Sequence, residues 1–186
     1  VGCGRPGRFF SFERADIVHD MVILSKSISG YGFPMSLLLM KPELDAWQPA
    51  EHTGTFRGNQ LAFVGGPAAL EYREHTDLEK EVEVKAAFLQ TFLETDIAPI
   101  APGIETRGLG MIWGIDLAGC GGGALAKQVA ARCFELGVIV ERVGRNDTVL
   151  KILPPLSIEM PILQKGCELI KQALGECVAH GAHPSD

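Results

Sequence analysis

The stretch MVILSKSISGYGFPMSLLLM, residues 21–40, constrains the fold most, because it places one lysine between two short apolar runs. The apolar run 21–24 predicts a buried strand, and residues 35–40 predict a second one. The segment between them contains two glycines and a proline, which predict a loop, because glycine permits positive φ and proline lacks a backbone donor. Lys26 is therefore expected at the end of a strand, beside a turn.

The amine of Lys26 has two interpretations. A lysine at a strand end can extend its ammonium group into water along its own aliphatic stem, which is a purely structural role. A lysine held in a partly dry site can instead have a lowered pKa and attack an aldehyde, forming a Schiff base. These twenty residues alone leave both interpretations open.

Residues 41–60 predict a long loop, followed by a helix that begins near Asn59. Within the loop, HTGTFRGN (52–59) offers backbone N–H groups, hydroxyls and an arginine to an anion. The sequence Gly-Gly-Pro at 65–67 interrupts the following segment, so we expect the helix to kink or break there. An interior proline costs a helix about 3 kcal/mol. A second helix is predicted over 78–94 from its apolar spacing.

The last third of the chain predicts a small α+β domain. One strand is expected to run to Leu117, followed by an amphipathic helix that stops at Gly137. Two strands about a turn at residues 144–147 come next, and a final helix is expected after Pro161. We expect the tail, 179–186, to be disordered, with its two histidines solvated and not bound to a metal.

Composition excludes several classes of protein. The net charge of −6 argues against nucleic acid as the main partner. No apolar run reaches the ~18 residues of a membrane helix. The five cysteines form no C-x-x-C pair, which favours reduced thiols in a cytoplasmic protein over disulfides or a metal site. GCGRPG, at residues 2–7, predicts a surface loop and not a dinucleotide site, because no strand precedes it.

Four segments resemble, in order, the C-terminal half of class III aminotransferases, which are pyridoxal-phosphate (PLP) enzymes of fold type I. They are LSKSISGYGFPMS, EHTGTFRGNQLAF, RGLGMIWGID and VLKILPPLSI. The resemblance implies an α/β fold, the C-terminal portion of the PLP-dependent transferase fold. Residues 1–77 would end a large, mostly parallel-sheet PLP-binding domain, and residues 78–186 would form the small C-terminal domain. It also favours the Schiff-base interpretation of Lys26.

The resemblance implies a role for four residues and no metal. Lys26 would be the catalytic lysine that binds PLP. Gly54 and Thr55 would hold the cofactor phosphate, with the threonine reaching the cofactor of the partner subunit in a homodimer. Lys151 stands where many members carry an arginine for the substrate α-carboxylate. A lysine cannot make the planar bidentate contact, so a solvent-facing strand residue is the alternative.

Within this family, the motifs are most similar to members that move an amino group from glutamate to aspartate 4-semialdehyde, giving 2,4-diaminobutyrate for ectoine biosynthesis. Enzymes acting on ornithine, acetylornithine or 4-aminobutyrate stay open, as does a non-catalytic remnant. The chain opens with Val1, which suggests a piece of a longer protein. The family's aspartate for the cofactor pyridine nitrogen would lie before Val1, so we expect the chain to be inactive by itself.

Overall fold

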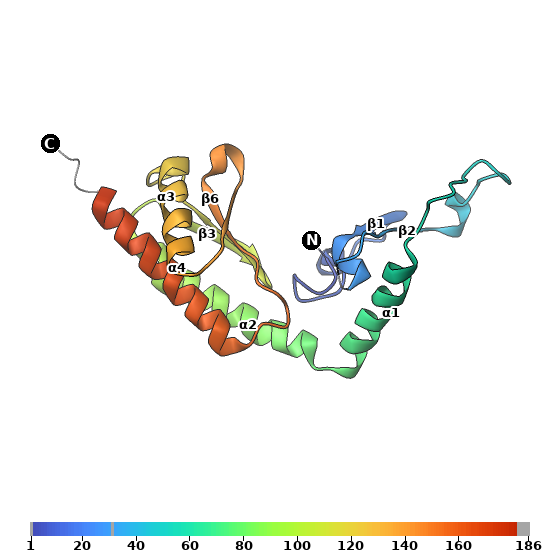
Figure 1. The fold of residues 1–186 in the computed structure, drawn as a ribbon, viewed down its shortest axis with the longest axis horizontal. Coiled ribbons are helices and arrows are strands. Elements are labelled where there is room, and N and C mark those ends of the chain that lie inside the picture. The colour runs from blue at the N-terminus through green and yellow to red at the C-terminus, as the bar shows by residue number, and fades with distance from the viewer. Residues whose placement is uncertain (1, 31, 182–186) are drawn as a thin grey trace. The chain divides into compact units, whose positions relative to one another are not determined.

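The computed structural model describes residues 2–30 and 32–181, which divide into two compact units (Figure 1). The first unit comprises residues 2–4 and 8–79, and the second comprises residues 5–7 and 80–181. The assignment of residues 1–77 and 78–186 to two domains of a longer protein stays a prediction.

The first unit contains a two-stranded antiparallel sheet, β1 (Met21–Ser25) and β2 (Ser36–Met40), in which Ser25 lies opposite Ser36. The prediction of a buried strand is wrong for this chain, because Met21 is 53% and Ile23 81% exposed. Among the described residues this sheet has only two strands, and a two-stranded ribbon cannot bury both of its faces. Three short 3₁₀ turns complete the unit: η1 (Ser11–Arg14), η2 (Lys26–Ser29) and η3 (Pro42–Leu44).

The long helix of the first unit is α1 (Gln60–His75). It begins where predicted, because the side chain of Asn59 accepts hydrogen bonds from the N–H groups of Leu61 and Ala62 and so caps the helix. The predicted break at residues 65–67 is wrong, since the helix continues through Pro67 without interruption. Packing of α1 against the turn after β1 offsets the cost of the proline, as tertiary contacts commonly override local propensity.

The second unit is built on a four-stranded antiparallel sheet in the order β3-β4-β6-β5. Its strands are β3 (Glu105–Leu109), β4 (Ile112–Asp116), β5 (Glu141–Val143) and β6 (Val149–Ile152). The single strand predicted up to Leu117 is in fact the hairpin β3–β4. Leu109 pairs with Ile112, so only two residues form the turn, and two-residue loops are the commonest hairpin connections.

The helices agree with the predicted ones except at their ends. They are α2 (Leu78–Phe92), α3 (Gly122–Glu135) and α4 (Met160–Gly181), with the short π-helical η4 (Leu93–Ile97) and the 3₁₀ turns η5 (Ala98–Ile100) and η6 (Arg145–Asp147). The predicted disordered tail is wrong for residues 179–181, which belong to α4, because each residue added to a helix gains a backbone hydrogen bond. The rest of that tail, with His183, lies outside the described residues.

The main hydrophobic core lies in the second unit. Helix α3 packs on α4 and contacts β5 and β6, as Figure 1 shows. The largest fully buried side chains all belong to this unit, and they are Val82, Leu89, Leu93, Ile97, Met111, Ile115, Leu117, Val129, Cys133, Leu150, Cys167 and Leu174. The mixture of helices and sheets confirms the α/β class, but every described strand pair is antiparallel.

The glycine-rich segment 2–7 is not simply a surface loop, because Gly4 and Pro6 are buried. The guanidinium group of Arg5 donates hydrogen bonds to the carbonyl oxygens of Met111, at 3.1 Å, and Pro154, at 2.7 Å. An arginine has five N–H donors, so one side chain can hold two backbone segments of the second unit together.

Candidate active site

Lys26 begins the η2 turn directly after β1, as the sequence predicts. Its backbone has a φ of +56°, which lies in the left-handed region that side-chain-bearing residues rarely adopt. Such a conformation costs about 1–3 kcal/mol and persists only where the surrounding structure fixes it, commonly at functional sites. The side chain itself is exposed, so the dry environment expected around the amine is not present among the described residues.

Buried neighbours within the same turn fix the backbone of Lys26. Ser29 is completely buried, and its hydroxyl donates a hydrogen bond to the carbonyl oxygen of Lys26 over 3.2 Å. Ile28 beside it is also buried. The N–H of Gly30 donates to the carbonyl oxygen of Ser27 at 3.0 Å, which closes the turn. The lysine is thus exposed on a turn whose other end is packed inside the unit.

Helix α1 supports the packed end of this turn through small residues. A methyl group added at Gly66 would lie 3.0 Å from the carbonyl oxygen of Ile28. One added at Gly30, which has a φ of +76°, would lie 2.4 Å from the Cβ of Ala69. At Gly30 the positive φ and these short distances require glycine, whereas at Gly66 a methyl group would press on the turn. Ala62, Gly66 and Ala69 follow one another at helical spacing, and this small-residue pattern is the feature of the sequence that indicates a close contact on this face of α1.

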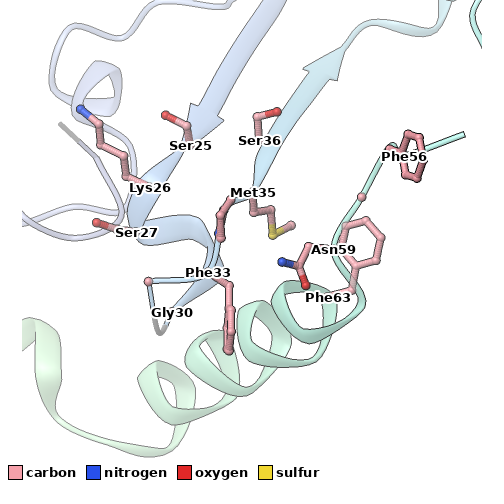
Figure 2. Close-up of a pocket in the computed structure, with 13 residues that line it drawn as sticks. Ser25, Lys26, Ser27, Gly30, Phe33, Met35, Ser36, Phe56, Asn59 and Phe63 are labelled. Carbon is pink, nitrogen blue, oxygen red and sulfur yellow. The ribbon is translucent and has the colours of Figure 1, made fainter. Parts of the chain in front are cut away.

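A cavity of about 1270 Å³ opens beside Lys26 in the first unit. Figure 2 shows Lys26 at one side of it, Asn59 and Phe63 at the start of α1, and Phe56 at the far side. The hydroxyls of Ser25, Ser27 and Ser36 also line it. It is at least as large as ordinary cofactor sites, which occupy about 300–1,000 Å³. An amine, several hydroxyls and aromatic rings fit an aromatic aldehyde that carries a phosphate, such as PLP.

The other residues predicted for the cofactor lie on an exposed loop. Gly54 and Thr55 are both exposed, and neither lines the cavity beside Lys26, although Phe56 and Gly58 of the same loop do. Residues 54–57 form a turn, which is closed where the N–H of Arg57 donates to the carbonyl oxygen of Gly54 at 3.3 Å. The structure therefore brings the loop to the cavity but does not turn Thr55 into it.

Lys151, the predicted substrate residue, lies on β6 in the second unit. It pairs across the sheet with Glu141 of β5, and the two side chains form an ion pair. The hydrogen bond from Lys151 holds the pKa of the Glu141 carboxyl below its usual value. Within this chain the ammonium of Lys151 already has a carboxylate partner, and it is only partly exposed.

The described residues contain neither a cluster of metal ligands nor a membrane-spanning helix. Across residues 2–30 and 32–181, no three His, Cys, Asp or Glu side chains are placed to hold a metal ion. In the same part of the chain, no helix combines the length and apolar character needed to cross a membrane.

Residues 1–174 match the family described as Aminotransferase class-III. The chain belongs to this family. Class III aminotransferases depend on PLP, so the cofactor prediction is confirmed at the level of the family. The lysine turn over a cavity that fits PLP agrees with this membership, although the roles of Lys26, Gly54, Thr55 and Lys151 stay predictions.

The relatives are similar to this chain along nearly all of its length. The diaminobutyrate–2-oxoglutarate transaminase of Wolinella succinogenes is 49% identical, over 95% of this chain and 40% of that protein. The enzyme of the same name from Bordetella parapertussis is 47% identical, over 96% of this chain and 41% of that protein. The chain thus spans about two fifths of the length of these relatives.

A solved structure supports the fold. The ornithine aminotransferase of Toxoplasma gondii, crystallised with partial occupancy of PLP at its active site, superposes with a TM-score of 0.87. The alignment covers 98% of this chain and 43% of that one, at 23% sequence identity. The likeness confirms the prediction that the chain adopts part of the PLP-dependent transferase fold.

Proposed function

We propose that this chain is the C-terminal part of a PLP-dependent aminotransferase in which Lys26 carries the cofactor. The observation that supports this most is the left-handed turn that holds Lys26 beside a large cavity in a member of the class III family. A lysine with a purely structural role needs neither a strained backbone nor a buried turn behind it.

The chemistry divides between cofactor and protein. When bound, PLP supplies an aldehyde for the amino group and a ring that withdraws electrons from it. The Nζ of Lys26 would hold the cofactor at its aldehyde group. As a free amine, the same Nζ would act as the base that moves a proton from the substrate carbon that bears nitrogen. Hydroxyls of Ser25, Ser27 and Ser36 would donate to oxygens of the bound groups, and the rings of Phe33 and Phe63 would offer apolar surface to the cofactor.

The reaction we propose is amino transfer from glutamate to aspartate 4-semialdehyde, giving 2-oxoglutarate and 2,4-diaminobutyrate, the step that feeds ectoine biosynthesis. Relatives that are 49% and 47% identical, and named for this reaction, support the assignment. Lys151 would bind the substrate α-carboxylate, which requires it to exchange Glu141 for the substrate. A flexible ammonium can make that exchange more readily than a fixed guanidinium fork.

We place the enzyme in the cytoplasm as a homodimer. Thr55 is exposed on a loop that reaches the cavity of its own chain through Phe56 and Gly58 instead. A threonine outside the cavity of its own chain can serve the cofactor of a second copy, and a two-fold axis then makes the exchange reciprocal. The test is a mixed dimer of one Thr55→Ala subunit and one Lys26→Ala subunit. If the threonine serves the partner's cofactor, one of the two sites retains both residues, whereas if it serves its own chain, neither site does.

The substrate assignment is tested with the full-length protein and 2-oxoglutarate as amino acceptor. The amino donors 2,4-diaminobutyrate, ornithine, acetylornithine and 4-aminobutyrate are compared by the glutamate formed. We expect 2,4-diaminobutyrate to give the largest kcat/KM. A larger value with another donor would contradict the substrate but leave the aminotransferase assignment in place, whereas no glutamate with any donor would contradict both.

The 186-residue chain alone is proposed to be inactive, because relatives are more than twice its length. The same glutamate assay, run with this chain and added PLP, tests the point. Turnover equal to that of the full-length protein would contradict it.

A further inference from the structure

We propose that Ser29 is a positioning residue for Lys26: its buried hydroxyl, through the Lys26 carbonyl oxygen, holds the backbone conformation that directs the amine toward the cofactor. This inference rests on the proposed function, since it concerns how the same lysine is aimed. It deepens that function by naming a residue that touches neither cofactor nor substrate.

The contact geometry supports this role. Ser29 and Lys85 are the only polar side chains among the buried residues of the described chain. Within the described residues, the Ser29 hydroxyl donates a hydrogen bond to the carbonyl oxygen of Lys26, three residues earlier, at 3.2 Å. A buried hydroxyl without a partner is costly, so this bond ties the two residues firmly. It acts on the peptide that follows Lys26, one of the two whose orientations define the left-handed conformation of that residue.

The position of Ser29 is itself fixed from the other side. Ile28 contacts α1 at Gly66, and Gly30 contacts it at Ala69. The turn therefore packs on helix α1, and the Ser29 hydroxyl links that packed end of the turn to the lysine. Rotation of the Lys26 backbone out of the left-handed region would redirect the start of its side chain and therefore the amine.

The neighbouring hydroxyls act differently. Ser25 and Ser27 flank Lys26 but line the cavity and are exposed. They are free to contact a ligand, whereas Ser29 has no exposed surface. Substitution of Ser29 should therefore change the rate at which Lys26 reacts, with little effect on how tightly substrates bind.

The test uses the full-length protein stripped of cofactor. PLP is added, samples are reduced with borohydride at intervals, and mass spectrometry of the Lys26 peptide gives the rate of attachment. Ser29→Ala is expected to slow this rate about tenfold and to lower kcat with the KM for glutamate unchanged. Ser29→Thr, which keeps a hydroxyl, should recover most of the rate.

Thr76→Ala is the matched control. It removes a hydroxyl that donates to the carbonyl oxygen of Tyr72 at 2.8 Å, at the opposite end of α1. We expect the normal rate of attachment with this variant. An equal slowing by Thr76→Ala and Ser29→Ala would overturn the proposal, because it would indicate a general loss of stability.

A second pair of variants changes the helix that supports the turn. It tests the inference if Ser29→Ala does not fold. Gly66→Ala places a methyl group against Ile28 and is expected to slow attachment, whereas Gly166→Ala, on α4, meets no atom within 4 Å and should not. Normal attachment in Ser29→Ala, or in Gly66→Ala when that variant has to decide, overturns the inference. No attachment at Lys26 in the unsubstituted protein overturns the proposed function itself.

Discussion

At the scale of single residues, Lys26 shows which features of the site can be predicted from the sequence and which cannot. Its place at a strand end followed from the apolar run before it, and the family from the motifs around it. Its positive φ and its hydrogen-bonded partner Ser29 could not be predicted, because Ser29 is one of several serines in that stretch and burial alone distinguishes it. A long-range contact with α1 decides that burial.

Asp116 is expected to stabilise the sheet of the second unit in a pH-dependent way. Its carboxylate accepts hydrogen bonds from the N–H of Ala118, the guanidinium of Arg107 and the hydroxyl of Thr148. These bonds lower the pKa of Asp116, and the bond from the Ala118 N–H has the largest effect. A carboxyl whose pKa is lower in the folded state stabilises fully above its ordinary pKa of about 4 and loses that contribution as the pH falls through the lowered value.

Asp116→Asn should therefore lower the free energy of unfolding by about 1–2 kcal/mol at neutral pH. Urea unfolding of both proteins at about pH 7 and about pH 3 measures the effect. The difference between them should shrink at the lower pH. An equal difference at both values would mean that the charge of the carboxylate is not what stabilises the sheet.

Two cysteine thiols should resist chemical labelling in the folded chain. Burial raises the pKa of Cys167 to about 12 and that of Cys133 to about 11, and only the thiolate is nucleophilic. With a maleimide near neutral pH, both should react at least about a hundredfold more slowly than in urea. Peptide mapping assigns the label, and rapid reaction of either thiol without urea would contradict the burial described for α3 and α4.

At the scale of elements, the pattern of apolar residues predicts which helices and strands form better than it predicts where one of them is interrupted. The helices over 78–92 and 122–135 and the hairpin of β5 and β6 followed from spacing. The hairpin β3–β4 was predicted as one strand, because its turn contains only Gly110 and Met111 and the apolar run continues through it. Gly-Gly-Pro in α1 was predicted as a break because local propensity ignores what the helix packs against.

Pro67→Ala should stabilise the first unit, since it restores a backbone N–H in the middle of α1 at an exposed position. We expect a gain of about 1–3 kcal/mol in the free energy of unfolding, measured with urea. Pro161→Ala is the matched control, because Pro161 lies in the first turn of α4, where a helix does not use that N–H. Equal gains from both substitutions, or a loss from Pro67→Ala, would contradict the continuous helix.

At the scale of the whole chain, the two units differ in how much they bury. The second unit holds nearly all of the buried apolar side chains, whereas the first exposes Met21, Ile23 and most of β2. The prediction of buried strands there followed from their composition, which is typical of a sheet covered on both faces. The apolar composition of β1 and β2 indicates that these strands need cover on both faces. The described residues do not supply that cover.

Hydrogen exchange of this 186-residue chain should reveal the contrast. The amides of β4 and β6, which pair with each other at the centre of the four-stranded sheet, should exchange slowly. Those of β1 and β2 should exchange at least about a hundredfold faster, because protection follows the buried contacts around each strand. Equal protection in both sheets would contradict the described difference in burial.

The most direct test of the central claim is to locate the cofactor. The full-length protein is incubated with PLP, reduced with borohydride and digested, and the peptides that carry a phosphopyridoxyl group are identified. We expect the label on Lys26 alone, and its loss in Lys26→Ala with the thermal unfolding midpoint nearly unchanged, because the exposed side chain contributes little to packing. Label on another lysine, or an equally labelled Lys26→Ala protein, would contradict the account.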